Sequence, residues 1–197
     1  MKLQVYQSYW GMVELPFNGD EEWSMEEKLE KIAEAGFDGV EFLMEEKAHR
    51  DAMVPLCDRL GLKRSNIVFP WTPEEFDDDI KAAQDGGASH INLQPMPMPR
   101  RVADGVSYIV RCMDRAAVAG YQLFFETHRD RMTTDMYFTL DLIEAAKAMP
   151  EYGRALMAMR NGELEQALVM LQSLHTSYPQ LSGPLVNQGR IYWQQEK

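Results

Sequence analysis

The segment FFETHRDRMTTD, residues 124–135, places charged side chains directly after an apolar run. The run YQLFF, residues 121–125, has the composition of a buried strand, and Glu126, His128, Arg129 and Asp130 follow it. A carboxylate and an imidazole at the end of a buried strand can hold a metal ion or move a proton. The spacing therefore indicates one part of a catalytic or metal site, whose other members must come from elsewhere in the chain.

Strand-like and helix-like segments alternate from residue 1 to about residue 148, which predicts a parallel sheet with crossover helices. Ser24 and Glu27 have the spacing of a capping box, and Thr72 with Pro73 predicts the N-cap and first position of the third helix. The expected strands span residues 3–10, 37–43, 65–71, 88–95 and 121–128, and the expected helices span residues 24–36, 48–62, 72–87, 102–120 and 133–149.

Polar or aromatic residues stand at the end of every expected strand, where parallel sheets bind their ligands. These residues are Trp10, Glu41 with Glu45, Trp71, Gln94, and Glu126 with His128. Indole rings stack on the CH faces of sugars, and glutamate or glutamine side chains bond hydroxyl groups. We therefore expect Trp10, Glu41, Trp71 and Gln94 to bind substrate, while the nearby Arg100 or Arg101 could hold a phosphate.

The pattern changes after Pro150, where no strand signal follows and three helices are expected. Gly162, Ala167 and Pro179 stand where a tetratricopeptide repeat has its turn glycine, its helix B alanine and its terminal proline. Residues 149–197 thus resemble one such repeat and the first helix of a second. Three amphipathic helices without repeat ancestry are the alternative.

The segments GFDGVEF, GASHINLQP, FFETHRDRMTTD and TLDLIEA together resemble the xylose isomerase-like sugar isomerase and epimerase superfamily, over residues 1–148. The resemblance implies an α/β fold, a partial (β/α)8 TIM-barrel-like domain of five βα units, followed here by the all-α repeat-like segment. It also implies a divalent metal, manganese or magnesium, with Glu126 as a metal ligand that exchanges a proton with the sugar carbon. His128 matches a neighbouring position that faces substrate.

Each assignment has a structural alternative. Glu126 could be a solvated carboxylate paired with Arg129 or Arg131, and His128 could bond a backbone carbonyl. The tryptophans could pack between loops, and Glu41 could simply end its strand in solvent. The arginines near residue 100 could belong to a solvated basic loop.

The remaining ligands of the resembled family's metal site come from its sixth, seventh and eighth strands, for which this chain has no pattern. Because such a barrel needs eight units and about 250 residues, we expect an incomplete site with weak or no activity. The open sheet edges are expected to be covered by the helices after Pro150 or by a second copy in a homo-oligomer. The join near Pro150 fits a truncated gene fused to a repeat, an assembled chimera, or a compact domain that kept part of an ancestral site.

The net charge of -11, from 31 acidic and 20 basic residues, disfavours nucleic acid and anionic membranes as partners. Cys57 and Cys112 lie far apart in helical segments, so no disulfide framework or cysteine metal pair is expected. With no signal-peptide pattern and no apolar run of spanning length, we expect a cytoplasmic protein.

The expected function is that of a sugar or sugar phosphate isomerase or epimerase homologue, in which a proton moves next to a carbonyl. A second hypothesis is a protein-interaction module in which the helices of residues 152–193 dock a partner peptide. A third, a flavodoxin-like nucleotide-binding sheet, is disfavoured because no glycine-rich phosphate loop follows the first strand.

Overall fold

The computed structural model of the chain describes residues 3–17, 21–147, 155, 158–159, 162–177, 179 and 182–195. The chain folds as two compact units. Met1–Pro97 and Arg111–Arg131 form the first unit, and Met98–Val110 and Met132–Lys197 form the second. The predicted boundary between residues 148 and 149 lies outside the described residues.

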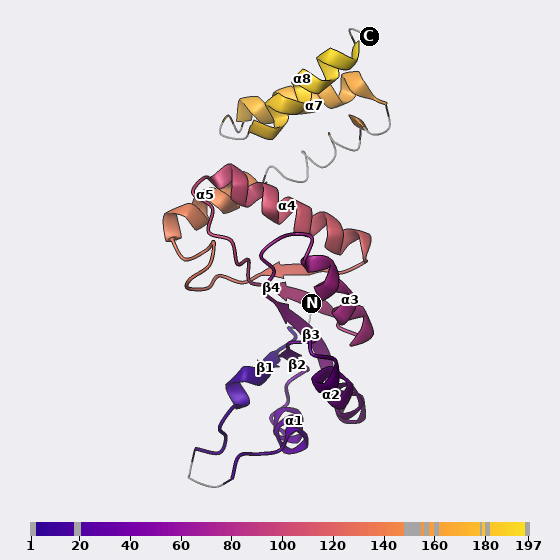
Figure 1. The fold of residues 1–197 in the computed structure, drawn as a ribbon, viewed down its shortest axis with the longest axis vertical. Helices are drawn as coiled ribbons and strands as arrows, with labels where there is room; N and C mark the ends of the chain where they lie inside the picture. The colour runs from indigo at the N-terminus through magenta and orange to yellow at the C-terminus, as the bar shows by residue number, and fades with distance from the viewer. Residues whose placement is uncertain are drawn as a thin grey trace. The chain divides into compact units, whose positions relative to one another are not determined.

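A five-stranded sheet organises the first unit, and all its neighbouring strands are parallel, in the order β1-β2-β3-β4-β5 (Figure 1). The α/β class and the five strands are confirmed. The strands are β1 Tyr6–Ser8, β2 Gly39–Phe42, β3 Lys63–Val68, β4 His90–Leu93 and β5 Leu123–Phe125. The first strand is shorter than predicted, because the chain turns into the 3-10 helix η1, Tyr9–Met12, directly after Ser8.

The helix expected after each of the five strands is present. They are α1 Met25–Glu34, α2 Lys47–Leu60, α3 Phe76–Asp85, α4 Val102–Val118 and α5 Met136–Lys147. The predicted capping box holds α1, since Ser24 Oγ accepts from the Glu27 amide at 3.3 Å and the Ser24 amide donates to Glu27 Oε2 at 2.8 Å. None of the described helices combines the length and the apolar character needed to span a bilayer.

The predicted start of the third helix at Thr72 is wrong, because α3 begins only at Phe76. Thr72 Oγ1 does accept from the Glu75 amide at 3.2 Å, as a cap would. The Phe76 amide bonds the Thr72 carbonyl at 3.4 Å over four residues, but the Asp77 and Asp78 amides bond the Glu74 and Glu75 carbonyls, each at 3.1 Å, over three residues. A tight turn therefore precedes the helix, and the cap-like threonine belongs to that turn.

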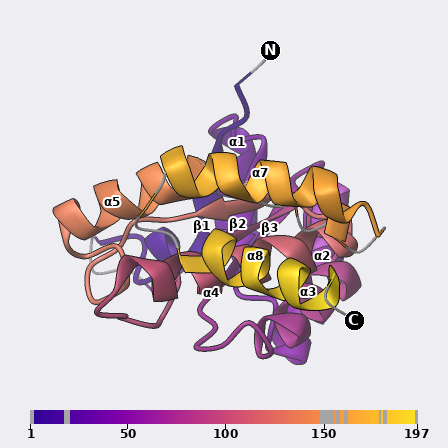
Figure 2. The same ribbon diagram turned by 90° about the horizontal axis from the view of Figure 1, so that it is seen from above.

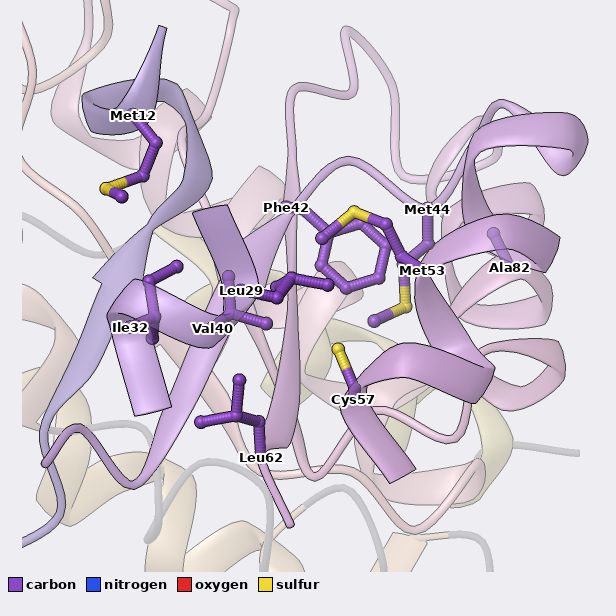
Figure 3. Packing of buried hydrophobic residues seen from close by; sticks show 10 residues of the cluster. All are labelled: Met12, Leu29, Ile32, Val40, Phe42, Met44, Met53, Cys57, Leu62 and Ala82. Carbon is purple, nitrogen blue, oxygen red and sulfur yellow. The ribbon is translucent and has the colours of Figure 1, made fainter. Parts of the chain in front are cut away.

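The core of the first unit lies between the sheet and the helices α1 and α2. Side chains alternate across a strand, so Val40 and Phe42 of β2 both point into this layer. Figure 3 shows Phe42, Met44, Met53 and Cys57 converging there. All are at most 2% exposed, so this face of the sheet is fixed by packing, and the opposite face is left to carry polar groups.

The second unit includes two helices that pack side by side, α7 Leu164–Ser177 and α8 Ser182–Gln195 (Figures 1 and 2). Ala167 and Leu171 of α7 and Ile191 of α8 are fully buried. Gln188 Nε2 of α8 donates to the Leu171 carbonyl at 3.0 Å. Residues 155, 158 and 159 are also helical, and the rest of that predicted helix lies outside the described residues.

The partly buried Asp79 in the first turn of α3 makes the stability of the first unit depend on pH. Burial, reinforced by the negative charges of Glu45, Asp78 and Glu75, raises the pKa of its carboxyl from 3.8 to about 7. The folded state therefore binds this proton more tightly than the unfolded chain, and stability falls as pH rises from about 4 to about 7.

Replacing Asp79 by asparagine removes this titration. We expect Asp79→Asn to raise the free energy of unfolding by about 1–2 kcal/mol at pH 8 and to leave it nearly unchanged at pH 4. Urea denaturation of both proteins at the two pH values measures the difference. An equal gain at both pH values would contradict the assignment, since it would not come from the proton.

Candidate functional site

The face of the sheet that points away from α1 and α2 carries the polar side chains. Glu41 lies between the buried Val40 and Phe42, and Asn92 lies between Ile91 and Leu93, which are both fully buried. Since neighbouring side chains along a strand point to opposite faces, Glu41 and Asn92 share the face opposite the core. The sheet therefore has one apolar face and one face that carries functional groups.

The Asn92 side chain joins two carboxylates from different strands. Its Nδ2 donates to Glu41 Oε2 at 3.0 Å and to Glu126 Oε2 at 2.7 Å. Ser65 Oγ lies 3.3 Å from the same Glu41 oxygen and donates to it. The Glu126 amide donates to the Leu93 carbonyl at 3.0 Å, which fixes Glu126 directly beyond the end of β5. Glu41 and Glu126, 85 positions apart in the chain, are thus held within reach of one amide nitrogen.

The environment of Glu41 raises the pKa of its carboxyl. Burial raises the pKa of its carboxyl, the hydrogen bond from Asn92 lowers it, and the negative charge of Glu126 raises it again. The net direction is upward. Two neighbouring carboxyl groups, one of which holds its proton more tightly than usual, can serve as an acid and a base toward the same ligand.

A cavity of about 440 Å³ opens beside this pair. Five residues predicted for the site line it: Trp10, Glu41, Gln94, Glu126 and His128. The Trp10 ring stacks on Phe69 with ring centroids 6.0 Å apart and planes 25° apart, although Trp10 remains 63% exposed. The structure therefore brings residues from η1, β2 and the segments after β4 and β5 to one opening.

Trp71 is the one predicted site residue that does not line this cavity. Its side chain is 58% exposed, and its backbone amide donates to Glu75 Oε2 at 2.8 Å in the turn before α3. Arg101, considered as a phosphate ligand, forms two hydrogen bonds with Asp104 at 2.9 and 2.7 Å. Arg100 and Arg101 belong to the second unit, whereas the residues that line the cavity belong to the first.

His128 and Arg131 line the cavity and are its imidazole and guanidinium groups. His128 Nδ1 lies 2.7 Å from the carbonyl oxygen of Arg129, which is the backbone contact considered as an alternative for this histidine. The Arg131 guanidinium lies over the Phe69 ring, 5.8 Å from its centroid. Arg131 is the one arginine among the residues that line this cavity.

A row of aromatic side chains lies beside the polar groups of Asn92 and Glu126. His90 precedes Asn92 by two residues, and Phe124 precedes Glu126 by two residues. His90 meets Tyr6 and Phe124 edge to face, with centroids 4.9 and 5.2 Å apart. Burial lowers the pKa of His90, which favours its neutral form. This row lies on the same face of the sheet as Asn92 and Glu126.

The described residues do not form a metal centre of the expected kind. No group of three or more histidine, cysteine, aspartate or glutamate side chains among them could hold a metal ion. Glu41 and Glu126 both direct an oxygen at Asn92 Nδ2, an amide nitrogen that donates hydrogen bonds and does not bind cations. A manganese or magnesium ion at Glu126 would need ligands from outside the described part of the chain.

The sequence did not predict several residues of the site, among them Asn92, Phe69 and Arg131. A signal existed for Asn92, because an amide inside the apolar run HINL must either be hydrogen-bonded or face a ligand. No comparable signal marked Phe69, which follows an ordinary apolar strand.

Solved structures with a similar fold exist, although no protein-family model and no curated protein sequence matches the chain. An AP endonuclease, family 2 from Brucella melitensis is similar with a TM-score of 0.51 at 16% identity, over 72% of this chain and 64% of that one. The fold is that of a partial TIM-barrel-like protein. A sugar phosphate isomerase/epimerase from Parabacteroides distasonis matches with a TM-score of 0.47 at 16% identity, over 62% of this chain and 50% of that one.

The chain spans about half of the length of the isomerase/epimerase and about two thirds of the endonuclease. In a TIM-barrel-like fold the ligand site lies at the carboxyl ends of the strands. The cavity beside Glu41 and Glu126 lies at that end of this sheet.

Proposed function

We propose that the chain is a sugar or sugar phosphate isomerase or epimerase homologue that binds its ligand in the cavity beside Glu41 and Glu126. The observation that carries this proposal is the Asn92 side chain, which donates to both carboxylates at the mouth of a parallel sheet. Isomerisation through an enediol and epimerisation next to a carbonyl both remove a proton from the carbon beside the carbonyl and return a proton to carbon. A base and an acid held side by side meet that requirement.

In this proposal Glu126 is the base that accepts the carbon-bound proton. Glu41 is the acid, because burial and the neighbouring carboxylate favour its protonated form. Asn92 positions both groups through its amide and prevents them from moving apart as charge is transferred. A proton donated by Glu41 would stabilise the charge that develops on the sugar oxygen.

The remaining walls suit a polyhydroxylated ligand. Trp10 offers an exposed indole face to the CH face of a sugar ring, and Gln94 offers an amide to its hydroxyl groups. Arg131 lies on the same cavity and would pair with a phosphate on the ligand. These features support a sugar phosphate as well as a free sugar.

In this proposal the carboxyl groups of Glu41 and Glu126 carry out the proton transfer. A divalent ion at Glu126, as the sequence resemblance implies, would polarise the carbonyl, but the described residues do not supply its other ligands. We propose that turnover by this chain is weak for that reason.

Two tryptophans of similar exposure allow a controlled test of the ligand site. Trp10 is 63% exposed and lines the cavity, whereas Trp71 is 58% exposed and does not. With a panel of ketoses, aldoses and their monophosphates in calorimetric titrations, we expect Trp10→Ala to weaken binding by about 10-fold or more. Trp71→Ala should bind as the wild type does. Equal effects of the two substitutions, or no binding by any member of the panel, would overturn the proposed site.

A second candidate function, docking of a partner peptide by a tetratricopeptide-like segment over residues 152–193, is supported by the helix pair of the second unit. α7 and α8 pack together, and Gly162 has a φ of 81°, as a turn glycine before a helix requires. Ala155 and Ala167, at small-residue positions of the repeat pattern, are fully buried. The exposed Val169 and Trp193 would offer apolar contacts to the peptide.

Net charge, cysteine content and sheet order bear on the location and the macromolecular partners of the chain. We propose a cytoplasmic protein without nucleic-acid or membrane partners, in keeping with a net charge of -11 and with two buried, free cysteines. A second copy of the chain covering the outer edge of β1 or β5 is the oligomer that the open sheet order supports.

A further inference from the structure

A second cavity lies beside the first, between η1 and the start of α2. Its volume is about 560 Å³. Its walls include the rings of Tyr9, Trp10 and Phe42, the carboxylates Glu45 and Glu46, and the imidazole of His49. Trp10 also lines the cavity beside Glu41 and Glu126, so the two cavities share one wall.

Two rings of this second cavity, those of the part-buried Tyr9 and the exposed Trp10, are not fully used in packing, whereas the Phe42 ring belongs to the core. His49 meets the Tyr9 ring edge to face at 5.6 Å and lies 6.0 Å from the Phe42 ring at 44°. The Tyr9 ring already attracts an ammonium group, since Lys28 Nζ lies 5.6 Å from its centroid while it pairs with Glu22. Trp10 keeps more than half of its surface exposed.

The charge of the cavity is negative. Glu45 and Glu46 are exposed, and within the described residues no ion pair joins either of them to a lysine or arginine. None of the lining residues is a lysine or arginine. The negative charge of Glu45 extends to Asp79, whose pKa it helps to raise. Aromatic faces together with uncompensated carboxylates are the chemistry that recognises an organic ammonium ion.

We propose that the second cavity binds an organic ammonium group, and that the ligand spanning both cavities is an amino sugar. Its hydroxyl and carbonyl groups would lie against Glu41, Asn92 and Glu126, with one ring face on Trp10. Its ammonium group would lie between the aromatic rings and the carboxylates of Glu45 and Glu46. The choice of ligand rests on the function proposed above, whereas the ammonium site does not.

Other ligand classes fit the second cavity less well. An anion would meet two carboxylates in a chain of net charge -11. A bare divalent cation would need a third oxygen or nitrogen ligand, and no such group of metal ligands occurs among the described residues.

A pair of sugars that differ in one group tests the inference. D-Glucose and D-glucosamine are titrated into the chain at about pH 7, where the sugar amine is largely protonated. We expect glucosamine to bind about 10-fold more tightly than glucose at low ionic strength, and this ratio to fall in 0.5 M salt, about three times a physiological ionic strength of 0.15 M. In the Glu45→Gln, Glu46→Gln double variant the ratio should fall to about 1, with glucose binding unchanged. Equal binding of the two sugars by the wild type would overturn the proposal.

Choline, an organic cation without a sugar, separates this inference from the proposed function. We expect choline to shift the His49 and Trp10 nuclear magnetic resonance signals of the wild type and not those of the double variant. Glu34→Gln, which removes one exposed carboxylate of α1, is the matched control and should bind choline as the wild type does. Binding of glucose without any choline shifts would overturn the ammonium site and leave the sugar site standing. Choline shifts without sugar binding would overturn the amino sugar and the proposed function together.

Discussion

Replacing Glu126 by glutamine is expected to lower the proton-transfer rate on a bound ketose by about 100-fold or more. Glutamine has nearly the same shape, and its carbonyl oxygen can still accept from Asn92 Nδ2, which now lies 2.7 Å from Glu126 Oε2. It cannot accept a carbon-bound proton. Uptake of deuterium from heavy water into the sugar, followed by nuclear magnetic resonance, measures this step even where net turnover is slow.

The control for this experiment is Glu34→Gln, which also removes one carboxylate but lies on the exposed face of α1, where Glu34 pairs with Lys31 at 2.9 Å. Its deuterium uptake should equal that of the wild type. Unchanged uptake in Glu126→Gln would show that Glu126 is not the base, and the catalytic part of the account would then fail.

Truncation of Phe42 is expected to have the largest effect on stability. Its side chain is 2% exposed and lies among the buried sulfur-containing side chains of Met44, Met53 and Cys57 (Figure 3). Phe42→Ala loses the transfer free energy of the ring and leaves a cavity, so we expect the free energy of unfolding to fall by about 3–5 kcal/mol. Urea denaturation followed by circular dichroism measures the change.

Phe17→Ala is the matched control, because the same truncation occurs at a side chain that is 76% exposed. Its free energy of unfolding should change by less than about 0.5 kcal/mol. A similar loss in both variants would contradict the description of the core layer between the sheet and α1 and α2.

Local sequence patterns were sufficient to predict the arrangement of the first unit. The Ser24 and Glu27 capping box was predicted correctly because its bonds lie within one turn of chain. Thr72 was misread because its hydroxyl makes the same local bond in a tight turn, and only the following backbone bonds separate that turn from a helix. Short-range signals therefore located the elements but not always their ends.

The site depended on contacts that no local pattern records. Glu126 and Glu41 were singled out separately as strand-end carboxylates, but their link through Asn92 requires the register of β2, β3, β4 and β5. Trp71 was expected at the cavity because it follows β3, yet the turn before α3 carries it elsewhere. The direction in which a loop leaves a strand is set by tertiary packing, and a single sequence does not reveal it.

Titration of the Glu41 carboxyl is a direct test of the pairing of Glu41 with Glu126, because it needs neither a substrate nor turnover. Carbon-13 nuclear magnetic resonance of the side-chain carboxyl groups follows it, with Glu41→Gln identifying the signal. The paired site predicts a pKa above the ordinary 4.5 in the wild type, because of burial and the charge of Glu126, and a lower pKa in Glu126→Gln, where that charge is gone. A Glu41 carboxyl that titrates at its ordinary pKa in both proteins would contradict the acid and base pair at this site.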